Sequence, residues 1–133
     1  MTRYNFIATT ILVFPIYLAP VSITLATDHR VPVMVGGEVD FDACGGTGKV
    51  INLDPAGDNY LSVRSGPSSK FEEIDRLPNR SEMFLCDEKG SWYGIVYPIG
   101  DCGVMSPIEN RQQYNGVCKS GWVFKQYIEL VSG

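Results

Sequence analysis

The sequence predicts a small all-β domain. Apolar runs of about five residues are separated by turn residues at intervals of about 8 to 12 positions, which is typical of a barrel or a sandwich. No stretch of the chain shows a sustained helical period. The chain has 133 residues, of which 44% are hydrophobic and 20% are charged. This length suits one domain, and this composition suits a folded one.

The N-terminal segment has the pattern of an export signal. Residues 6–23 carry no charged side chain, Arg3 precedes them, and the apolar run ends at Ala26 before a polar stretch. A positive start, an apolar middle and a small residue at the exit are typical of a secretory signal peptide. We therefore predict that residues 1–26 form a signal peptide that is cleaved after Ala26. An uncleaved membrane anchor is the alternative, because about 18 apolar residues nearly span a bilayer.

Residues 27–47 are expected to form an N-terminal arm. Two adjacent glycines loosen this segment, so we interpret it as a linker with one short edge strand at residues 31–35. The arm carries three closely spaced carboxylates, at Glu38, Asp40 and Asp42. They lack the glycine and the distal glutamate of a loop that wraps calcium, so we interpret them as a solvated acidic turn.

The strands are expected in residues 48–131. Leu61 and Val63 alternate with polar residues, which predicts a strand with one face in the core. The stretch 91–97 is apolar on both faces, as a central strand is. Turn residues gather at 54–59 and at the tip of an expected hairpin around Gly90. The predicted strands are residues 48–53, 60–65, 71–77, 81–87, 91–97, 121–124 and 128–131.

Four cysteines indicate two disulfides, because an even number in a small exported chain is typical of a disulfide framework. Three pairings are possible, and we favour Cys44–Cys86 together with Cys102–Cys118. The first would tie the arm to a strand, and the second would close a long interruption of the strand pattern. A zinc site is disfavoured, because the chain has no C-x-x-C pair and only one histidine.

Several motifs resemble those of bacterial SH3-like domains. The stretch 61–67, Leu-Ser-Val-Arg-Ser-Gly-Pro, with an aromatic at Phe71, is similar to the opening of such a domain. Gly-Ser-Trp-Tyr at 90–93 and Gly-Trp-Val at 121–123 are similar to later landmarks of the family, in the same order. The resemblance covers about residues 48–131 and implies a small SH3-like barrel of about five to seven short strands.

Two features depart from the family pattern. The turn at residues 78–80 lacks the usual glycine, so we expect Asn79 to take any left-handed position. Residues 98–120 form an insertion where the family has a short turn. We predict that the insertion is stapled by Cys102–Cys118 and that it contributes to specificity together with the arm.

The resemblance implies a non-catalytic binding module outside the cytoplasm, in the periplasm or the extracellular space, that recognises a cell-wall (peptidoglycan) peptide or a protein partner. SH3-like barrels bind extended peptides along aromatic-lined grooves. Tyr114 is the leading contact candidate, because it lies in a polar insertion where no predicted strand would require an aromatic residue for the core. Arg64 is expected to be structural, with its guanidinium holding a loop. The candidate binding residues are Phe71, Trp92, Tyr97, Arg111 and Tyr114.

An inhibitor or immunity protein, secreted or periplasmic, is the alternative function. The whole chain has a net charge of −4, and a small acidic barrel could plug a basic enzyme cleft. The same charge argues against a nucleic-acid partner, which requires clustered Lys and Arg. An enzyme is not expected, because the one base available to a nucleophile is His29 in the arm. We expect no cofactor and no metal.

Overall fold

The structure of the chain, a computed structural model, describes residue 5 and residues 9–23 and 29–133. Residues 9–23 have no regular secondary structure, and the predicted cleavage site at Ala26 lies outside the described residues. In the part that is described, no helix has the length and apolar character needed to cross a membrane. The signal peptide therefore stays a prediction.

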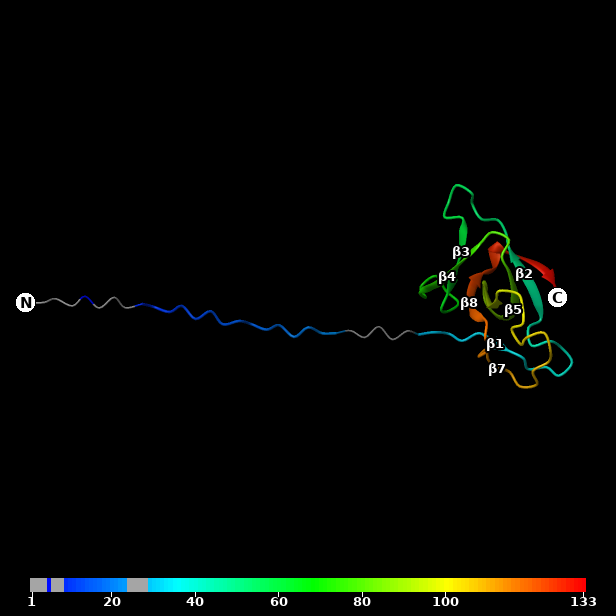
Figure 1. Ribbon diagram of the computed structural model, residues 1–133, viewed down its shortest axis with the longest axis horizontal. Coiled ribbons are helices and arrows are strands. Elements are labelled where there is room, and N and C mark those ends of the chain that lie inside the picture. The colour runs from blue at the N-terminus through cyan, green and yellow to red at the C-terminus, as the bar shows by residue number, and fades with distance from the viewer. Residues whose placement is uncertain (1–4, 6–8, 24–28) are drawn as a thin grey trace, which may run out of the picture.

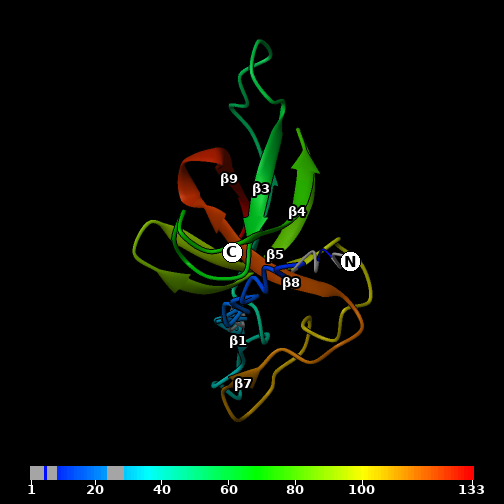
Figure 2. The same ribbon diagram turned by 90° about the vertical axis from the view of Figure 1, so that its left-hand side faces the viewer.

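Residues 29–133 form an antiparallel β-structure, as expected from the sequence (Figures 1 and 2). Seven strands make one sheet in the order β4-β3-β8-β6-β5-β2-β9, and β1 pairs with β7 in a separate two-stranded sheet. The strands of the large sheet are β2 (Gly46–Val50), β3 (Tyr60–Arg64), β4 (Glu73–Pro78), β5 (Glu82–Lys89), β6 (Trp92–Tyr97), β8 (Lys119–Phe124) and β9 (Ile128–Ser132). The small sheet is β1 (Met34–Val35) and β7 (Gln112–Gln113), and a 3₁₀ turn, η1 (Lys125–Tyr127), joins β8 to β9.

The expected barrel is corrected in one respect, because the sheet does not close. Strands β4 and β9 stand at its two ends, and among the described residues no ladder joins them. Strands β3 and β8 are joined by a single residue pair, Arg64 with Trp122. The architecture is therefore a strongly curved, open sheet rather than a hydrogen-bonded cylinder.

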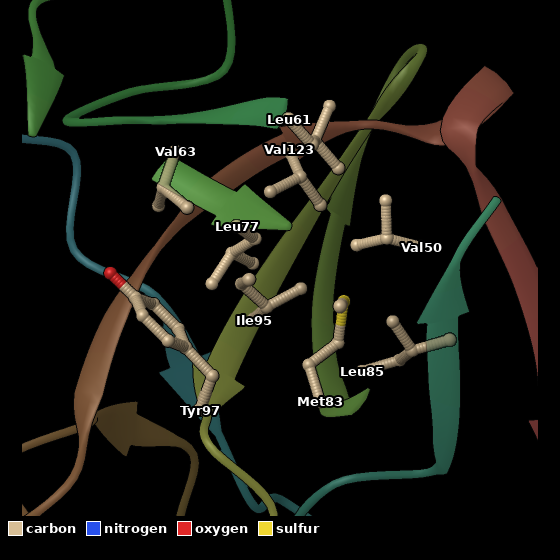
Figure 3. Packing of buried hydrophobic residues seen from close by; sticks show 9 residues of the cluster. All are labelled: Val50, Leu61, Val63, Leu77, Met83, Leu85, Ile95, Tyr97 and Val123. Carbon is tan, nitrogen blue, oxygen red and sulfur yellow. The ribbon is translucent and has the colours of Figure 1, made fainter. Parts of the chain in front are cut away.

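One side of the sheet encloses the main core (Figure 3). The alternation predicted for β3 is confirmed, because Leu61 is 5% exposed and Val63 is fully buried. Removing each such side chain from water contributes about 1.5–3 kcal/mol. The cluster consists of Val50, Leu61, Val63, Leu77, Met83, Leu85, Ile95, Tyr97 and Val123.

The opposite side of β5 and β6 carries a second core. Phe84 and Val96 alternate with the residues of the main core and therefore point to the other face. The arm and the insertion cover them with Val35 and Val104, each about 1% exposed. This second layer explains why the sequence of β6 is apolar on both faces. It also corrects our interpretation of the arm as a linker, since the arm is packed.

Two disulfides fasten this second layer to the sheet, and they are the pairs favoured from the sequence. Cys44–Cys86 joins the arm to β5 across 42 positions. Cys102–Cys118 closes the insertion across 16 positions. Each bridge removes conformational freedom from the unfolded chain, worth about 3 kcal/mol or more in the chain-entropy model.

A buried carboxylate, that of Asp87, lies where arm, insertion and sheet meet. Its side chain is 3% exposed. Its Oδ2 accepts a hydrogen bond from the backbone N–H of Met34 in the arm at 3.0 Å. Its Oδ1 accepts one from Nη2 of Arg111 in the insertion at 2.9 Å, and another from the N–H of Glu88 at 2.8 Å. Gly94 lies opposite on β6, where a Cβ would stand 2.7 Å from the Cβ of Asp87.

The arm is also bound by backbone groups along its length. The indole Nε1 of Trp122 donates to the carbonyl of Val31 at 2.7 Å, and the N–H of Val31 donates to the carbonyl of Ser65 at 2.9 Å. Further along, the carbonyl of Val33 accepts from the N–H of Tyr114 at 2.8 Å. Residues 31–35 therefore lie as an extended segment between β8 and the insertion.

The turn between β4 and β5 differs from our expectation. Arg80, not Asn79, takes the left-handed conformation, with φ of 71°. The N–H of Ser81 donates to the carbonyl of Pro78 at 3.2 Å, so Arg80 is the third residue of the turn. Type II turns place positive φ at this third position, which accounts for the difference.

We predict that Asp87→Ala lowers the free energy of unfolding by about 2–3 kcal/mol. The substitution leaves the N–H groups of Met34 and Glu88 and the guanidinium of Arg111 without the acceptor that they share in a partly buried place. Urea unfolding, followed by tryptophan fluorescence, measures the change. The neighbouring Glu88→Ala is the matched control and should shift stability by less than about 0.5 kcal/mol, because its side chain is 64% exposed. Equal losses in the two variants would contradict this role of Asp87.

Candidate functional site

A groove lined by aromatic side chains is the candidate site. It has a volume of about 600 Å³ and lies between the loop of residues 51–59, β3, and the place where β6 begins and β8 ends. Four aromatic residues line it, all half-buried: Tyr60, Trp92, Phe124 and Tyr127. A half-buried aromatic ring offers apolar surface to a ligand, and the buried part of the side chain keeps the ring in place.

Strand register places three of these rings in a row. Trp92 of β6 lies directly opposite Phe124 of β8, and their ring centroids are 5.5 Å apart at an angle of 59°. Tyr127 follows on η1, with its centroid 6.2 Å from that of Phe124 at 54°. Both pairs have the tilted geometry that aromatic rings prefer. The row is therefore held by the sheet and by its own ring contacts.

The loop of residues 51–59 forms one wall of the groove. Asp54 shapes this loop, because its Oδ1 accepts from the N–H of Ala56 at 2.9 Å and its carbonyl accepts from the N–H of Gly57 at 3.0 Å. Asn52 and Asn59 take positive φ angles, of 59° and 55°, at the two bends. Asparagine is among the few residues that adopt this conformation readily. Figure 1 shows the loop projecting beyond the sheet between β2 and β3.

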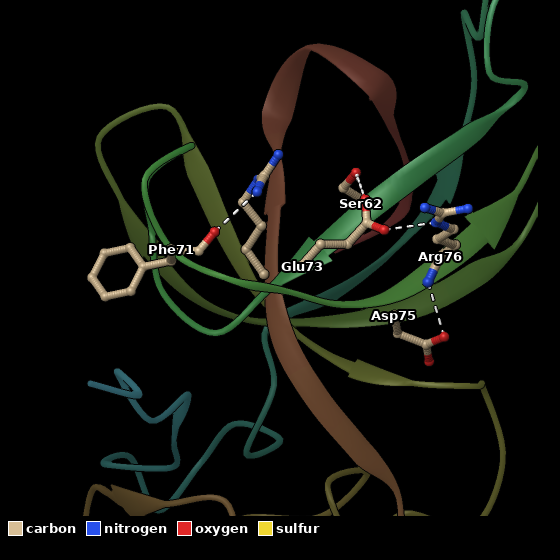
Figure 4. Close-up of polar contacts among 6 residues, drawn as sticks. Ser62, Phe71, Glu73, Asp75 and Arg76 are labelled. Carbon is tan, nitrogen blue, oxygen red and sulfur yellow. Dashed lines mark hydrogen bonds and ion pairs between the residues drawn. The ribbon is translucent and has the colours of Figure 1, made fainter. Parts of the chain in front are cut away.

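A polar cluster on β3 and β4 places Arg76 against Tyr60, and Figure 4 shows Ser62, Glu73 and Arg76 of this cluster. The guanidinium carbon of Arg76 lies 4.2 Å from the centroid of the Tyr60 ring. Arg76 Nε donates to Glu73 at 2.6 Å, and the hydroxyl of Ser62 donates to the same carboxylate. The hydrogen bond from Ser62, followed by that from Arg76, lowers the pKa of Glu73. Glu73 in turn raises the pKa of Arg76, so the pair stays ionised.

Arg64 has the structural role expected from the sequence. Its Nη1 donates to the carbonyl of Phe71 at 2.9 Å, which closes the loop between β3 and β4 (Figure 4). The ring of Phe71 covers Gly66, where a Cβ would lie 2.5 Å from the ring atoms. Gly66 is thus needed for a close approach. Phe71 is half-buried in that contact and does not line the groove.

The structure separates the five candidate binding residues. Trp92 is in the aromatic groove. Arg111 lines a different hollow and is bound to Asp87. Tyr97 belongs to the main core, is 4% exposed, and donates its hydroxyl to Asp75 Oδ2 at 3.1 Å. Burial, followed by the charge of Asp75, raises the pKa of Tyr97. Its position in the core leaves Tyr97 no surface for a ligand.

Tyr114 is not the exposed aromatic that the sequence predicts. It is half-buried against the second core. Its hydroxyl donates to the carbonyl of Cys102 at 2.9 Å and accepts from the N–H of Cys118 at 3.1 Å. Backbone N–H and C=O groups of the disulfide loop need hydrogen-bond partners, and the Tyr114 hydroxyl is the partner of two of them. The polar sequence around Tyr114 concealed its contact with the layer beneath.

Tyr60, Phe124 and Tyr127 are not among the candidates named from the sequence, because nothing in their local pattern distinguishes them from aromatic residues that pack into the core. The signal that could have found one of them is strand alternation. Phe124 is two positions after Trp122 and so lies on the same face, away from Val123 and the main core. Within residues 5, 9–23 and 29–133 no group of three or more His, Cys, Asp and Glu side chains is arranged to hold a metal ion.

The sequence model of the family described as the bacterial SH3 domain matches residues 59–129. The chain belongs to the bacterial SH3 domain family. Bacterial SH3 domains are commonly binding modules for peptidoglycan or for proteins. All four aromatic residues of the groove fall inside the matched region, whereas the arm and β2 lie before it. No curated protein and no solved structure matches the chain.

The carboxylate of Asp75 should make the stability of this SH3 domain depend on pH. Burial alone would raise its pKa, but hydrogen bonds from the N–H of Arg76, from Lys119 and from Tyr97 outweigh burial and lower it. An acid with a lowered pKa in the folded state contributes stability above its ordinary pKa of about 4, and this contribution is lost as the pH falls through the lowered value. Asp75→Asn should therefore cost up to about 1 kcal/mol at pH 7 and less at about pH 2, where protonation of the carboxylate has begun to remove its contribution.

Urea unfolding at the two pH values measures this difference. Asp101→Asn, at an exposed residue outside this cluster, is the control and should change stability little at either pH. A loss that is the same at both pH values would show that Asp75 acts through its shape rather than its charge.

Proposed function

We propose that the chain is a non-catalytic binding module that is exported from the cytoplasm and takes an extended cell-wall peptide in its aromatic groove. The row of half-buried rings at Trp92, Phe124 and Tyr127 is the observation that carries the proposal. Recognition of extended peptides commonly uses such aromatic-lined grooves. Membership of the bacterial SH3 domain family supports the same class of function.

The polar groups of the groove suit a short peptide that carries both charges. Asp54 and Asp58 lie on the loop side, before Tyr60, and Arg64 lies at the other end of β3. A strand rises about 3.3 Å per residue, so the two ends of β3 are about 13 Å apart, the length of about four extended residues. A peptide with an amine toward the loop and a carboxylate toward Arg64 fits this arrangement.

Export is supported by two observations. The uncharged run at residues 6–23 follows a basic residue, as in a secretory signal peptide. Both disulfides fasten the arm and the insertion to the domain, and disulfides persist in oxidising compartments. A binding module for cell-wall peptide acts in the same compartment.

Co-sedimentation of the purified protein with insoluble peptidoglycan tests the proposal. Trp92→Ala should weaken the apparent affinity for peptidoglycan by about tenfold, because it removes the first ring of the row. An effect of this size is typical of a central aromatic contact. Phe41→Ala is the matched control, since it removes an aromatic side chain that is 66% exposed and lies outside the groove. Near-identical circular dichroism spectra and melting temperatures would show that both variants are folded.

Equal retention of the two variants would remove the groove from the proposed site. Failure of the wild-type protein to sediment with peptidoglycan, combined with inhibition of a purified wall-degrading enzyme, would favour the alternative of an inhibitor or immunity protein.

A further inference from the structure

A second surface, far from the aromatic groove, exposes four large apolar side chains. Phe41 is 66% exposed, Met105 67%, Leu130 65% and Val131 51%. They come from three segments, namely the arm, the insertion and β9. We call these four residues the disulfide-end surface, because Cys44–Cys86 lies beside them.

The four side chains border two adjoining hollows. Phe41 and Met105 line one hollow of about 360 Å³. Leu130 and Val131 line another of about 720 Å³. The two hollows adjoin, because Gly45, Gly46, Ser132 and Gly133 line both of them. The four apolar side chains are therefore grouped at one end of the molecule, and grouped exposed apolar side chains mark interaction sites.

The segments that carry this surface are fixed in place. The N–H of Ala43 donates to the carbonyl of Ser106 at 3.0 Å, and the N–H of Cys44 donates to that of Val104 at 3.3 Å. Ala43 and Val104 are buried beside the exposed Phe41 and Met105. The side chains of Phe41 and Met105 thus project to solvent from segments whose neighbouring residues are buried and hydrogen-bonded. Such preorganisation reduces the entropy lost on binding.

A bulge in the sheet brings out Val131. Thr47 pairs with Ser132 and Gly48 pairs with Leu130, so Val131 is an extra residue with no partner on β2. Leu130 and Val131 are consecutive, and strand alternation alone would point one of them inward. The bulge lets both be exposed, and bulges are known to re-aim side chains at sheet edges.

Acidic groups surround the Phe41 side of this surface. Glu38, Asp40 and Asp42 are exposed, and none of them takes part in the ion pairs found among the described residues. The neighbouring cation, Arg111, is already bound to the carboxylate of Asp87. In the part of the chain that the structure describes, no ion pair neutralises the negative charge that borders this apolar surface.

We propose that the disulfide-end surface docks a protein partner that presents an apolar side chain within a ring of Lys and Arg. Charge complementarity selects this occupant, since a second copy of the chain would bring its own carboxylates to the same border. The site is separate from the aromatic groove. The loop of residues 51–59, which forms one wall of the groove, follows the Val50 end of β2 (Figure 1), whereas Gly46, which lines both hollows of the disulfide-end surface, begins that strand.

A labelled peptide of alternating lysine and leucine, KLKLKLK, is the probe, and its acidic counterpart ELELELE is the matched control ligand. Fluorescence anisotropy with the purified full chain should show binding of the basic peptide at low salt and none of the acidic one. The double variant Phe41→Ser/Met105→Ser should weaken binding of the basic peptide by at least about tenfold, because it removes both walls of one hollow.

Two protein controls make the result specific. Val117→Ser changes an apolar side chain that is 90% exposed but outside this surface, and Trp92→Ala changes the aromatic groove. Both should bind KLKLKLK as the wild type does. If the double variant binds as tightly as the wild type, or if Val117→Ser weakens binding equally, the proposal is wrong.

Sedimentation velocity over a range of concentrations tests the competing occupant. We expect one monomeric species for the wild type and for the double variant. A dimer that forms with concentration and disappears in the double variant would overturn the proposal and assign the surface to a second copy of the chain. Thermal melting of each variant shows that the substitutions act on binding and not on folding.

Discussion

The arrangement of the whole molecule depends on the carboxylate of Asp87. It accepts hydrogen bonds from the arm, from the insertion and from its own strand, at the bulge in β5 next to Cys86. A buried carboxylate is costly unless its oxygens are satisfied, so this group constrains all three segments at once. The requirement extends across the sheet to Gly94, since no larger residue fits against the Asp87 side chain. Local sequence choices on two strands thus follow from one buried charge.

The second layer changes what the sheet can do. In an open sheet with a single core, one face of β5 and β6 would be left to water. Here the arm and the insertion cover that face with Val35 and Val104, and two disulfides hold the cover in place. The covering segments then present new surface of their own. The four aromatic residues of the groove lie within the region that matches the bacterial SH3 domain family, whereas Phe41, Leu130 and Val131 of the disulfide-end surface lie outside it.

The sequence predicted those features that depend on local pattern. Alternation identified the strand at Leu61 and Val63, turn residues identified the hairpin at Gly90, and cysteine number and spacing pointed to the pairing found. Features that depend on long-range contacts were missed. Tyr114 stands in polar sequence, yet its hydroxyl satisfies backbone groups of the disulfide loop. The arm contains paired glycines, yet its Val33 and Val35 are buried.

The same distinction explains why one ring of the groove was predicted and three were not. Sequence alone does not tell which aromatic residues of a strand pack into the core and which line a groove, and most of them are buried. Whether Phe124 is core or surface depends on which face of β8 it occupies and on what covers that face. At Trp122, two positions earlier on the same face, the carbonyl of Val31 in the arm accepts the indole hydrogen bond and the ring is fully buried. The described part of the arm joins the sheet at Val31 and continues toward β1, so it covers Trp122 and leaves Phe124 beside the groove. The path of the arm, set by its contacts with Asp87 and Cys86, therefore separates the buried Trp122 from the half-buried Phe124 on a single strand.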